Sequence, residues 1–514
     1  MKMKNKRKKD VHKCDRFFRE MSRRFIGLTY KDVLLLTQHS KVVPAEADLR
    51  TKFSRNVGLN IPLCSSPMDT VTMHKMAIAM AMAGGIGIIH RSLTPKEQAS
   101  EVARVKHYLT GRLISKPICV GPSDSVKSVL RMIEEKNYTF RSFPVVDKEG
   151  KLAGLLTGND FDFCLNATVS VDKIMTLKDE LITVREDVDV KRAFKMMHKK
   201  QKKILPMVDS QNKLLGIYVF TDLKRQIMGI NKQYNVDAEG RLCVGAAVGV
   251  SDDDIQRAEL LVEKGVNVLV IDTAHGDTED VIRTLKKLKA LYPQVDVVAG
   301  NVSTAAEALS LVRAGADGIR VGQGPGSICT TRIISGSGRA QLTAVAEIAL
   351  ALRGMGVPII ADGGIKYSGD IVKALGAGAD SVMIGSLFAG TSESPGRIIM
   401  IGGGPFKVYR GMGSLGAMED SQASRDKYLQ KESKKGKLVP EGVEGAVPFK
   451  GDVAEFIYQL MGGLRSGMGY SGAKNIKVLQ KKALFEQITE GAQQESHPSV
   501  IITRDAPNYK KEES

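Results

Sequence analysis

Short runs of Val, Ile, Ala and Gly recur along the chain and alternate with longer stretches of helical periodicity. Apolar runs of this length between turn residues are typical of buried strands. We count eight of them, at residues 63–66, 85–89, 243–248, 268–271, 295–299, 318–321, 358–361 and 381–384. Eight strands alternating with helices predict an α/β protein with a (β/α)8 barrel. A doubly wound open sheet is the alternative, but there a glycine-rich loop follows the first strand, whereas here it follows the sixth.

The segment between the second and third runs, residues 111–225, contains an internal duplication. Each copy has an apolar run with a proline in its second position, then a Lys-Leu pair, then an aspartate. The first copy (about 112–165) places these features at 143–147, 151–154 and Asp160, and the second (about 174–225) repeats them 62 residues later, ending at Asp222. The sequence therefore predicts a barrel of residues 27–110 and 226–514, interrupted by a duplicated domain.

Composition narrows the class of protein. A chain of 514 residues is expected to hold two or three domains. The longest uncharged apolar run, residues 76–89, is interrupted by three glycines and is too short to span a bilayer, so no membrane association is expected. Six cysteines without CxxC spacing favour reduced thiols and a cytoplasmic location.

The net charge of +18 is concentrated at the N-terminus, where residues 1–25 carry eleven Lys or Arg against three acidic residues, a net of +8. We interpret residues 1–26 as a basic, disordered tail. Contact with nucleic acid or anionic lipid is the alternative, and an organelle-targeting role stays open, although a block of lysines differs from the Arg- and Ser-rich pattern of transit peptides.

The most distinctive stretch is the loop at residues 322–332, which reads GQGPGSICTTR. Three glycines in five positions allow the backbone to approach a ligand closely, and Cys329 follows them among hydroxyl groups and a cation. The loop leaves the carboxyl end of the sixth predicted strand, where α/β barrels carry their chemistry. Cys329 is therefore a candidate nucleophile. The alternative is a buried structural cysteine in a tight turn.

Polar residues and glycines also follow other predicted strands, namely Ser66, Asp272, Asp362 with Gly363 and Gly364, and Gly385 with Ser386. A carboxylate followed by two glycines suits a ribose phosphate, because its oxygens accept two hydroxyl protons and the glycines bring backbone N–H groups to the phosphate. An ordinary turn is the alternative for such a short motif.

The loop GPGSICTTR resembles the active-site loop of the IMP dehydrogenase and GMP reductase superfamily. Residues 362–365, 409–414 and 440–442 match further signatures of that family in the expected order. The resemblance extends from about Leu28 to Tyr509 and is closest to IMP dehydrogenases of the bacterial type. It implies a TIM barrel with an inserted tandem-CBS (Bateman) domain that binds purine nucleotides, with Asp160 and Asp222 on their riboses. The second repeat has Val219 where the first has Thr157, which weakens its ligand site, and a purely structural pair is the alternative.

The resemblance implies the NAD-dependent oxidation of IMP to XMP in guanine nucleotide synthesis. Cys329, with Thr331 beside it, would attack C2 of the purine, hydride would leave for NAD, and the resulting thioimidate would be hydrolysed. The implied substrate-binding residues are Ser66, Ser327, Asp362, Gly363, Gly364, Gly385, Ser386, Tyr409, Arg410, Gly411, Met412, Gly413 and Glu441. The implied NAD-binding residues are Asp272, Gly322, Gln323 and Gly324.

The resemblance also implies a mobile flap, at about residues 413–445, that supplies the base for hydrolysis from an Arg-Tyr pair. This chain departs from that pattern, because Lys427 precedes Tyr428 and the arginine, Arg425, lies two residues earlier. Lysine loses its proton more easily than arginine but cannot make the planar two-pronged contact. All three residues are candidates for the catalytic role.

A potassium site is implied as well, with backbone oxygens of Gly324, Gly326 and Cys329 completed across a subunit interface by Glu495, Ser496 and His497. It implies a homotetramer, while pairing of tetramers into octamers through the CBS domains stays open. An ordinary C-terminal turn is the alternative. Two other functions remain: a GMP reductase that uses NADPH, and a catalytically inactive nucleotide-sensing or nucleic-acid-binding protein, which the intact cysteine loop disfavours.

Overall fold

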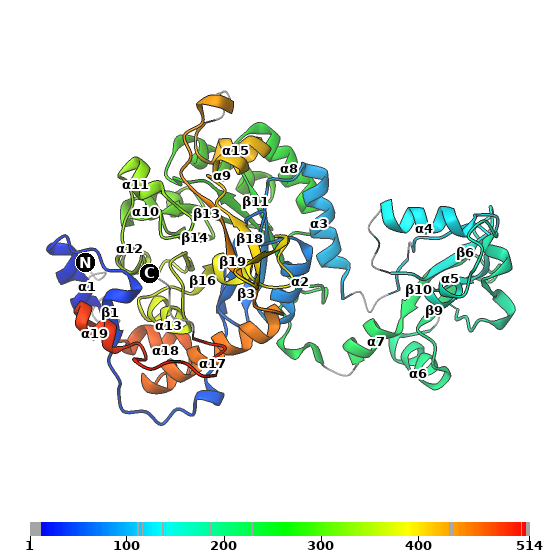
Figure 1. The fold of residues 1–514 in the computed structure, drawn as a ribbon, viewed down its shortest axis with the longest axis horizontal. Helices are drawn as coiled ribbons and strands as arrows, with labels where there is room; N and C mark the ends of the chain where they lie inside the picture. The colour runs from blue at the N-terminus through cyan, green and yellow to red at the C-terminus, as the bar shows by residue number, and fades with distance from the viewer. Residues whose placement is uncertain are drawn as a thin grey trace, which may run out of the picture. The chain divides into compact units, whose positions relative to one another are not determined.

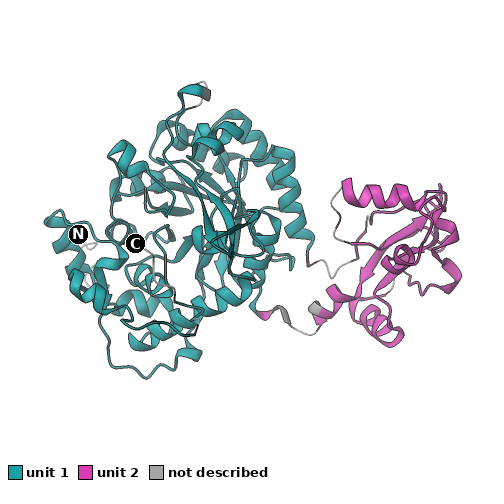
Figure 2. Cartoon of the chain, viewed as in Figure 1, with its two compact units in different colours: residues 1–108, 233–514 teal, residues 109–232 magenta. Residues whose placement is uncertain are grey.

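The computed structural model describes residues 12–109, 113–115, 117–135, 138, 140–185, 188–227, 230–430, 433, 435–504 and 506–509. The chain divides into two compact units (Figure 2), one of residues 1–108 and 233–514 and one of residues 109–232. The sequence predicted the corresponding boundaries at 27–110 with 226–514, and at 111–225. Within the described residues, no helix combines the length and the apolar character needed to cross a bilayer.

The larger unit is built on a closed parallel barrel (Figure 1). Its strands are β4 (Leu63–Ser65), β5 (Ile86–Ile89), β11 (Val244–Val248), β12 (Val268–Asp272), β13 (Asp296–Val302), β14 (Gly318–Val321), β15 (Ile359–Asp362) and β16 (Ser381–Ile384). Pairing of β16 with β4 closes the sheet. Buried side chains from several strands, among them Ile88, Val270 and Met383, form its core. The predicted (β/α)8 barrel is thus confirmed, and the open sheet is excluded.

Helices surround the barrel and begin where the sequence carries capping residues. The main ones are α2 (His74–Met82), α3 (Pro95–His107), α8 (Asp252–Glu263), α9 (Glu279–Leu291), α10 (Ala305–Arg313), α12 (Gln341–Leu352), α13 (Ser368–Gly376), α17 (Val453–Tyr470) and α18 (Ile476–Lys482). Thr94, Ser251 and Thr304 each form a capping box with an acidic residue three positions later. These caps fix the helix starts, and therefore the loops that precede them on the catalytic face.

A small antiparallel sheet follows the barrel and supports the predicted flap. It consists of β17 (Ile398–Ile401), β18 (Gly404–Arg410) and β19 (Glu444–Pro448), with β18 in the centre. The flap connects β18 to β19 and contains α15 (Leu415–Asp420) and α16 (Gln422–Lys427). Flap residues 431, 432 and 434 lie outside the described residues.

The smaller unit contains two similar halves, each with an antiparallel hairpin followed by a helix. The first half has α4 (Val126–Glu135), β6 (Phe143–Val146), β7 (Leu152–Leu156), α5 (Gly158–Asp162) and β8 (Thr176–Leu177), and the second has α6 (Val190–Lys200), β9 (Ile204–Val208), β10 (Leu214–Val219) and α7 (Phe220–Ile227). Each half has its own core. The two hairpins meet at equivalent positions, because Lys151 pairs with Lys213.

The expectation of a disordered tail through residue 26 is wrong for α1 (Asp15–Arg23). Phe18 and Met21 are buried, and Arg353 holds Asp15 through two contacts of 2.6 and 2.7 Å. The dense basic charge concealed an amphipathic pattern, because the arginines of α1 face solvent while the apolar positions pack on the barrel. Residues 1–11 of the predicted tail lie outside the described residues.

Candidate active site

A cavity of about 150 Å³ lies at the carboxyl ends of the barrel strands. It gathers most of the predicted site residues: Ser66, Gly322, Gln323, Gly324, Gly326, Ser327, Cys329, Thr331, Asp362, Gly363, Gly364, Gly385, Ser386, Tyr409, Gly411, Met412, Lys427 and Tyr428. The predicted residues that are not among those lining the cavity are Asp272, Arg410, Gly413, Arg425, Glu441, Glu495, Ser496 and His497. The nucleophile loop, the glycines after β15 and β16, and the flap therefore share one space.

Cys329 is held in a tight loop that is fastened to the end of the flap. Its backbone N–H donates to the Gly326 carbonyl at 3.1 Å, and its Sγ lies 3.3 Å from Thr331 Oγ1. The N–H of Thr330 donates to the carbonyl of Glu441 at 2.9 Å, and Cys329 bridges to Gly442. The position of the thiol thus depends on where the flap returns to the barrel.

Arg332 braces the same loop from behind. Its Nε donates to the Gln323 carbonyl at 2.9 Å, and its Nη2 donates to the Arg339 carbonyl. Gly324 and Gly338 both have positive φ, and a Cβ on either would stand 2.5 or 2.8 Å from Arg332 Cγ. The arginine stem therefore occupies the space that side chains at these two positions would need.

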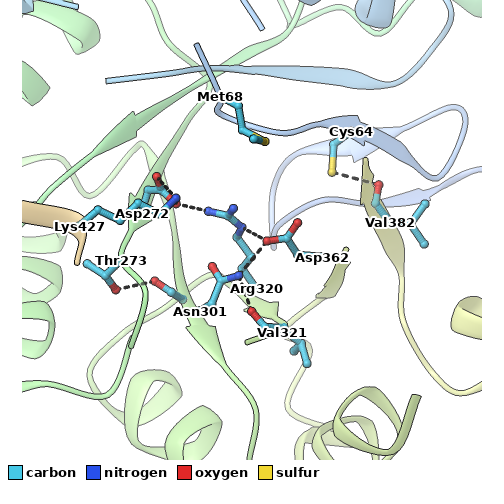
Figure 3. Close-up of polar contacts among 12 residues, drawn as sticks. Cys64, Met68, Asp272, Thr273, Asn301, Arg320, Val321, Asp362, Val382 and Lys427 are labelled. Carbon is cyan, nitrogen blue, oxygen red and sulfur yellow. Dashed lines mark hydrogen bonds and ion pairs between the residues drawn. The ribbon is translucent and has the colours of Figure 1, made fainter. Parts of the chain in front are cut away.

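A chain of buried and half-buried charges crosses the mouth of the barrel (Figure 3). Lys427 Nζ contacts both carboxylate oxygens of Asp272 at 2.8 and 2.7 Å, Arg320 bonds the same carboxylate, and Arg320 Nε donates to Asp362 Oδ2 at 2.8 Å. Asn301 Nδ2 also donates to Asp362 Oδ2, at 2.8 Å. Burial raises the pKa of Asp272, but Lys427 and Arg320 outweigh it and hold that pKa below its ordinary value.

The flap places Lys427 and Tyr428 in the cavity. Burial lowers the pKa of Lys427 below that of a free lysine, although the Asp272 carboxylate opposes the shift. Burial also raises the pKa of Tyr428, with a smaller contribution from Cys329, so its phenol stays neutral. The Tyr428 ring packs on Gly413, where a Cβ would stand 2.6 Å from it. The absence of a side chain at Gly413 therefore leaves room for the ring of Tyr428.

Arg425 does not reach this charge network. Its guanidinium donates to the Met418 carbonyl at 2.6 Å and to Gln422, within the flap itself. Of the two basic candidates on α16, the structure therefore brings only Lys427 to the cavity.

The opposite end of the cavity is formed by glycines and a buried phenol. Gly363 and Gly364 have φ of +89° and +79°, which lets the chain turn sharply after Asp362. A Cβ on Gly385 would stand 2.9 Å from the hydroxyl of Tyr409. Burial raises the pKa of Tyr409, which therefore remains a hydrogen-bond donor. Backbone N–H groups and a hydroxyl at this end suit an anion such as a phosphate.

Arg410 points away from the cavity. Its Nε and Nη2 contact Asp69 Oδ2 at 2.9 and 2.7 Å, and its Nη1 contacts Asp420 at 2.7 Å. This residue ties the loop after β4 to α15, so the structure gives it a role in holding the flap rather than in direct contact with a ligand.

Glu495, Ser496 and His497 lie at the end of α19 (Glu490–Glu495). His497 Nδ1 is 3.0 Å from the hydroxyl of Tyr509. In the described residues, no group of three or more His, Cys, Asp or Glu side chains is arranged for a metal ion. The predicted cation site uses carbonyl oxygens and a second subunit. One of the predicted ligand atoms fits this site: the carbonyl oxygen of Gly326 accepts a hydrogen bond from the Cys329 N–H and has a second lone pair for a cation.

Three polar residues that line the cavity were not predicted from the sequence: Thr273, Asn301 and Arg320. Arg320 had a signal, because a charged residue lies in a four-residue strand that is otherwise glycine and aliphatic. Asn301 was missed because β13 continues to Val302, whereas the predicted strand ended at 299.

The fold and the site together define a class: a (β/α)8-barrel enzyme with a candidate cysteine nucleophile, carboxylates and a glycine turn around one cavity. More narrowly, the chain belongs to the IMP dehydrogenase / GMP reductase family, whose domain model matches residues 27–499.

Relatives cover almost the whole chain. Inosine-5'-monophosphate dehydrogenase from Aquifex aeolicus is 51% identical over 94% of this chain and 97% of its own length. The Bacillus subtilis enzyme of the same name is 46% identical over 94% and 98%. Among solved structures, a cysteine-to-alanine variant of GMP reductase from Trypanosoma brucei, in complex with guanosine 5'-monophosphate, has a TM-score of 0.82 and 40% identity over 93% of this chain and 98% of that one.

Proposed function

We propose that this chain oxidises IMP to XMP with NAD, through a covalent adduct on Cys329, as a step of guanine nucleotide synthesis. The observation that carries the proposal is the cavity in which Cys329 faces the same space as Asp362, the glycines after β15 and β16, and the flap pair Lys427–Tyr428. The full-length likeness to inosine-5'-monophosphate dehydrogenases supports the direction of the reaction.

The substrate would lie with its phosphate at Gly363, Gly364 and Gly385 and its ribose on Asp362. That orientation directs the purine toward Cys329, whose Sγ forms a bond to C2. NAD, when bound, supplies the acceptor for the hydride that C2 then loses. The chain retains a thioimidate between Cys329 and the purine. A thiol suits this step because the thiolate is strongly nucleophilic and leaves readily when water attacks.

Asp272 fits a ribose diol only after Lys427 has withdrawn, because the ammonium contacts both of its oxygens. The flap and the dinucleotide therefore use the same carboxylate in turn. When the flap is closed, as here, Lys427 and Tyr428 fill the region beside Cys329 and leave room for water at the thioimidate rather than for a second nucleotide.

Hydrolysis requires a base, and Lys427 suits this role. Burial lowers its pKa, so a larger share of its amine is neutral near pH 7 than in a free lysine. Tyr428, kept neutral by burial, retains a hydroxyl that can donate a hydrogen bond from the same segment. The amine takes a proton from water, the oxygen attacks C2, and the bond to Cys329 breaks, which releases XMP.

The finer assignments remain part of the proposal. The potassium site at Gly324, Gly326 and Cys329, completed by residues 495–497 of another subunit, requires the homotetramer. Nucleotide binding near Asp160 is supported by the duplicated hairpins, which match the expected tandem-CBS arrangement. A cytoplasmic location rests on the six free cysteines.

A GMP reductase is the second candidate, and two observations favour it. Lys427 replaces the arginine expected of a dehydrogenase flap, and the solved structure named above is a GMP reductase. An inactive nucleotide sensor is disfavoured because the predicted nucleophile, Cys329, and the glycines predicted to bind the phosphate all line the cavity.

One pair of assays decides between the two activities. Purified protein with IMP and NAD is expected to produce NADH absorbance, while GMP and NADPH are expected to give no NADPH consumption. Consumption in the second mixture alone would establish the reductase, and a Cys329→Ala variant controls for contaminating enzymes in both.

A further inference from the structure

Gln341 is a buried glutamine beside the cavity, although it is not among the residues that line it. It is the first residue of α12, and only 2% of it is exposed. Its Nε2 donates to the Val321 carbonyl at 2.8 Å and to the Asp362 carbonyl at 3.1 Å. Val321 ends β14 and leads into the cysteine loop, residues 322–332, while Asp362 ends β15 and leads into the glycine turn, residues 363–364. One amide therefore holds both loops at the points where they leave the barrel.

This amide acts where the backbone pairing of the two strands stops. The last paired residues of β14 and β15 are Val321 and Ala361. Beyond that pair the two segments lie in direct contact, because a Cβ on Gly322 would stand 2.2 Å from the Asp362 carbonyl oxygen and 3.0 Å from Gln341 Nε2. The side chain of Gln341 thus extends the link between the strands by one step and fixes the start of the cysteine loop against the start of the glycine turn.

The two loops also contact each other further along the chain. A Cβ on Gly363 would stand 2.9 Å from Pro325 Cγ, and one on Gly364 would stand 3.6 Å from Pro325 Cβ. Pro325 lies four residues before Cys329, so the loop that carries the thiol rests on the turn that follows Asp362. A shift of one loop relative to the other therefore changes the distance between the thiol and any ligand that the turn binds.

A second glutamine makes the same kind of bridge away from the cavity. Gln98, fully buried on α3, donates from its Nε2 to the Ile89 carbonyl at 3.2 Å and to the Ala247 carbonyl at 2.9 Å. These carbonyls lie near the ends of β5 and β11, the pair of strands opposite β14 and β15 in the ring of eight. Residues 90–92 and 248–250, which follow them, are not among those that line the cavity. The two bridges are alike, but only the one at Gln341 joins two parts of the site.

We propose that Gln341 is a positioning residue for the reaction of Cys329. By holding Val321 and Asp362 together, its amide sets the distance between the thiol and a purine nucleotide whose ribose lies on the Asp362 carboxylate. The rate of bond formation depends steeply on this distance, and a misplacement of about 1 Å can lower it by about 10²-fold. The inference rests on the proposed function only in requiring a purine nucleotide beside Cys329, so it holds for a dehydrogenase and for a reductase alike.

The test compares two reagents that react with thiols. 6-Chloropurine riboside 5'-monophosphate is a purine nucleotide that loses chloride when a thiolate attacks its ring, so its rate at saturation depends on the placement of the thiol against the bound nucleotide. Iodoacetamide alkylates the same thiolate without a binding step, so its rate reports the reactivity and the exposure of the thiol itself. Mass spectrometry of the peptide that contains Cys329 measures both rates, and neither reaction needs a dinucleotide.

Two substitutions remove the bridge in different ways. Gln341→Met removes both hydrogen bonds, whereas Gln341→Glu keeps the shape and can donate to at most one carbonyl, and only when protonated. In both variants we expect the saturating rate with the chloropurine nucleotide to fall about tenfold or more, while the rate with iodoacetamide stays within about twofold. Gln98→Met and Gln98→Glu are the matched controls, and they should leave both rates unchanged.

An unchanged rate with the chloropurine nucleotide in the Gln341 variants would overturn the inference. An equal fall with both reagents would overturn it as well, because the change would then lie in the thiol and not in its placement. If the unmodified chain does not react with the nucleotide at all, the proposed function fails and the inference fails with it, whereas failure of the inference alone appears only in the variants. If Gln341→Met does not fold, as judged by its melting temperature, Gln341→Glu still decides.

Discussion

Replacement of Lys427 by methionine tests whether this lysine, rather than an arginine, serves as the hydrolytic base. The substitution keeps an apolar stem of similar length and removes the ammonium that contacts Asp272 at 2.7 and 2.8 Å. Asp272 retains its bond to Arg320, so the carboxylate stays compensated and the barrel should remain folded. The substitution therefore affects the closed position of the flap and the proton transfer, and leaves the barrel intact.

The magnitude follows from the role of a general base. Removing one typically slows its step by about 10²- to 10⁴-fold, which corresponds to about 3–5 kcal/mol in the barrier. In the proposed reaction, attack by Cys329 and hydride transfer precede flap closure and do not use Lys427. We therefore expect a rapid first turnover of NADH of normal amplitude, followed by a steady-state rate lowered by about that factor.

Stopped-flow absorbance resolves the two phases in a single experiment. Lys437→Met, an identical change at an exposed position of the same flap, is the matched control and should behave like the unmodified chain. An unchanged steady-state rate in Lys427→Met would remove Lys427 from the mechanism. Loss of the first turnover as well would show that the substitution disturbs the site rather than the base.

Three further predictions concern other parts of the same framework. Cys329→Ser should abolish both the first turnover of NADH and the covalent adduct, which intact-protein mass spectrometry would detect as the mass of the bound nucleotide; an adduct in this variant would contradict the assignment. The stability that Asp272 gains from its lowered pKa is present above its ordinary value of 3.8 and is lost as the pH falls toward the lower folded-state value. Thermal melts from about pH 7 to about pH 3 should therefore show a shallower acid slope for Asp272→Asn, and equal slopes would refute this. Asp15→Asn should weaken the contacts to Arg353 and lower stability by about 1–3 kcal/mol in denaturant titrations, with activity unchanged; no loss would mean that α1 is not anchored there.

The sequence was sufficient to predict the barrel because burial on both faces makes its strands continuous apolar runs. It was also sufficient for the nucleophile loop and the glycines after β15 and β16, since these depend on local residue types at strand ends. The N-terminal helix was mistaken for a tail because the eleven basic residues in 1–25 outweighed apolar positions such as Phe18 and Met21, which follow helical spacing. That error arose from composition being weighed above periodicity.

Contacts between distant segments were beyond the sequence. Lys427 and Asp272 are 155 residues apart, and no local pattern indicates that one would neutralise the other. Arg320 could have been noticed as a charge within a buried strand, but its two acidic partners become visible only when β12 and β15 are placed on either side of the same barrel mouth. Electrostatic networks of this kind depend on tertiary geometry.

The shared use of Asp272 imposes an order on the proposed reaction. While the Lys427 ammonium holds both carboxylate oxygens, a ribose has no acceptor there, so hydride transfer must precede flap closure. Closure then gains a buried ion pair and places a lysine of lowered pKa beside the thioimidate. Arginine would hold the carboxylate as well but gives up its proton far less readily. A Lys427→Arg variant should therefore keep the flap closed and shift the rise of hydrolysis rate to higher pH, whereas an unchanged pH profile would mean that the proton is taken by another group.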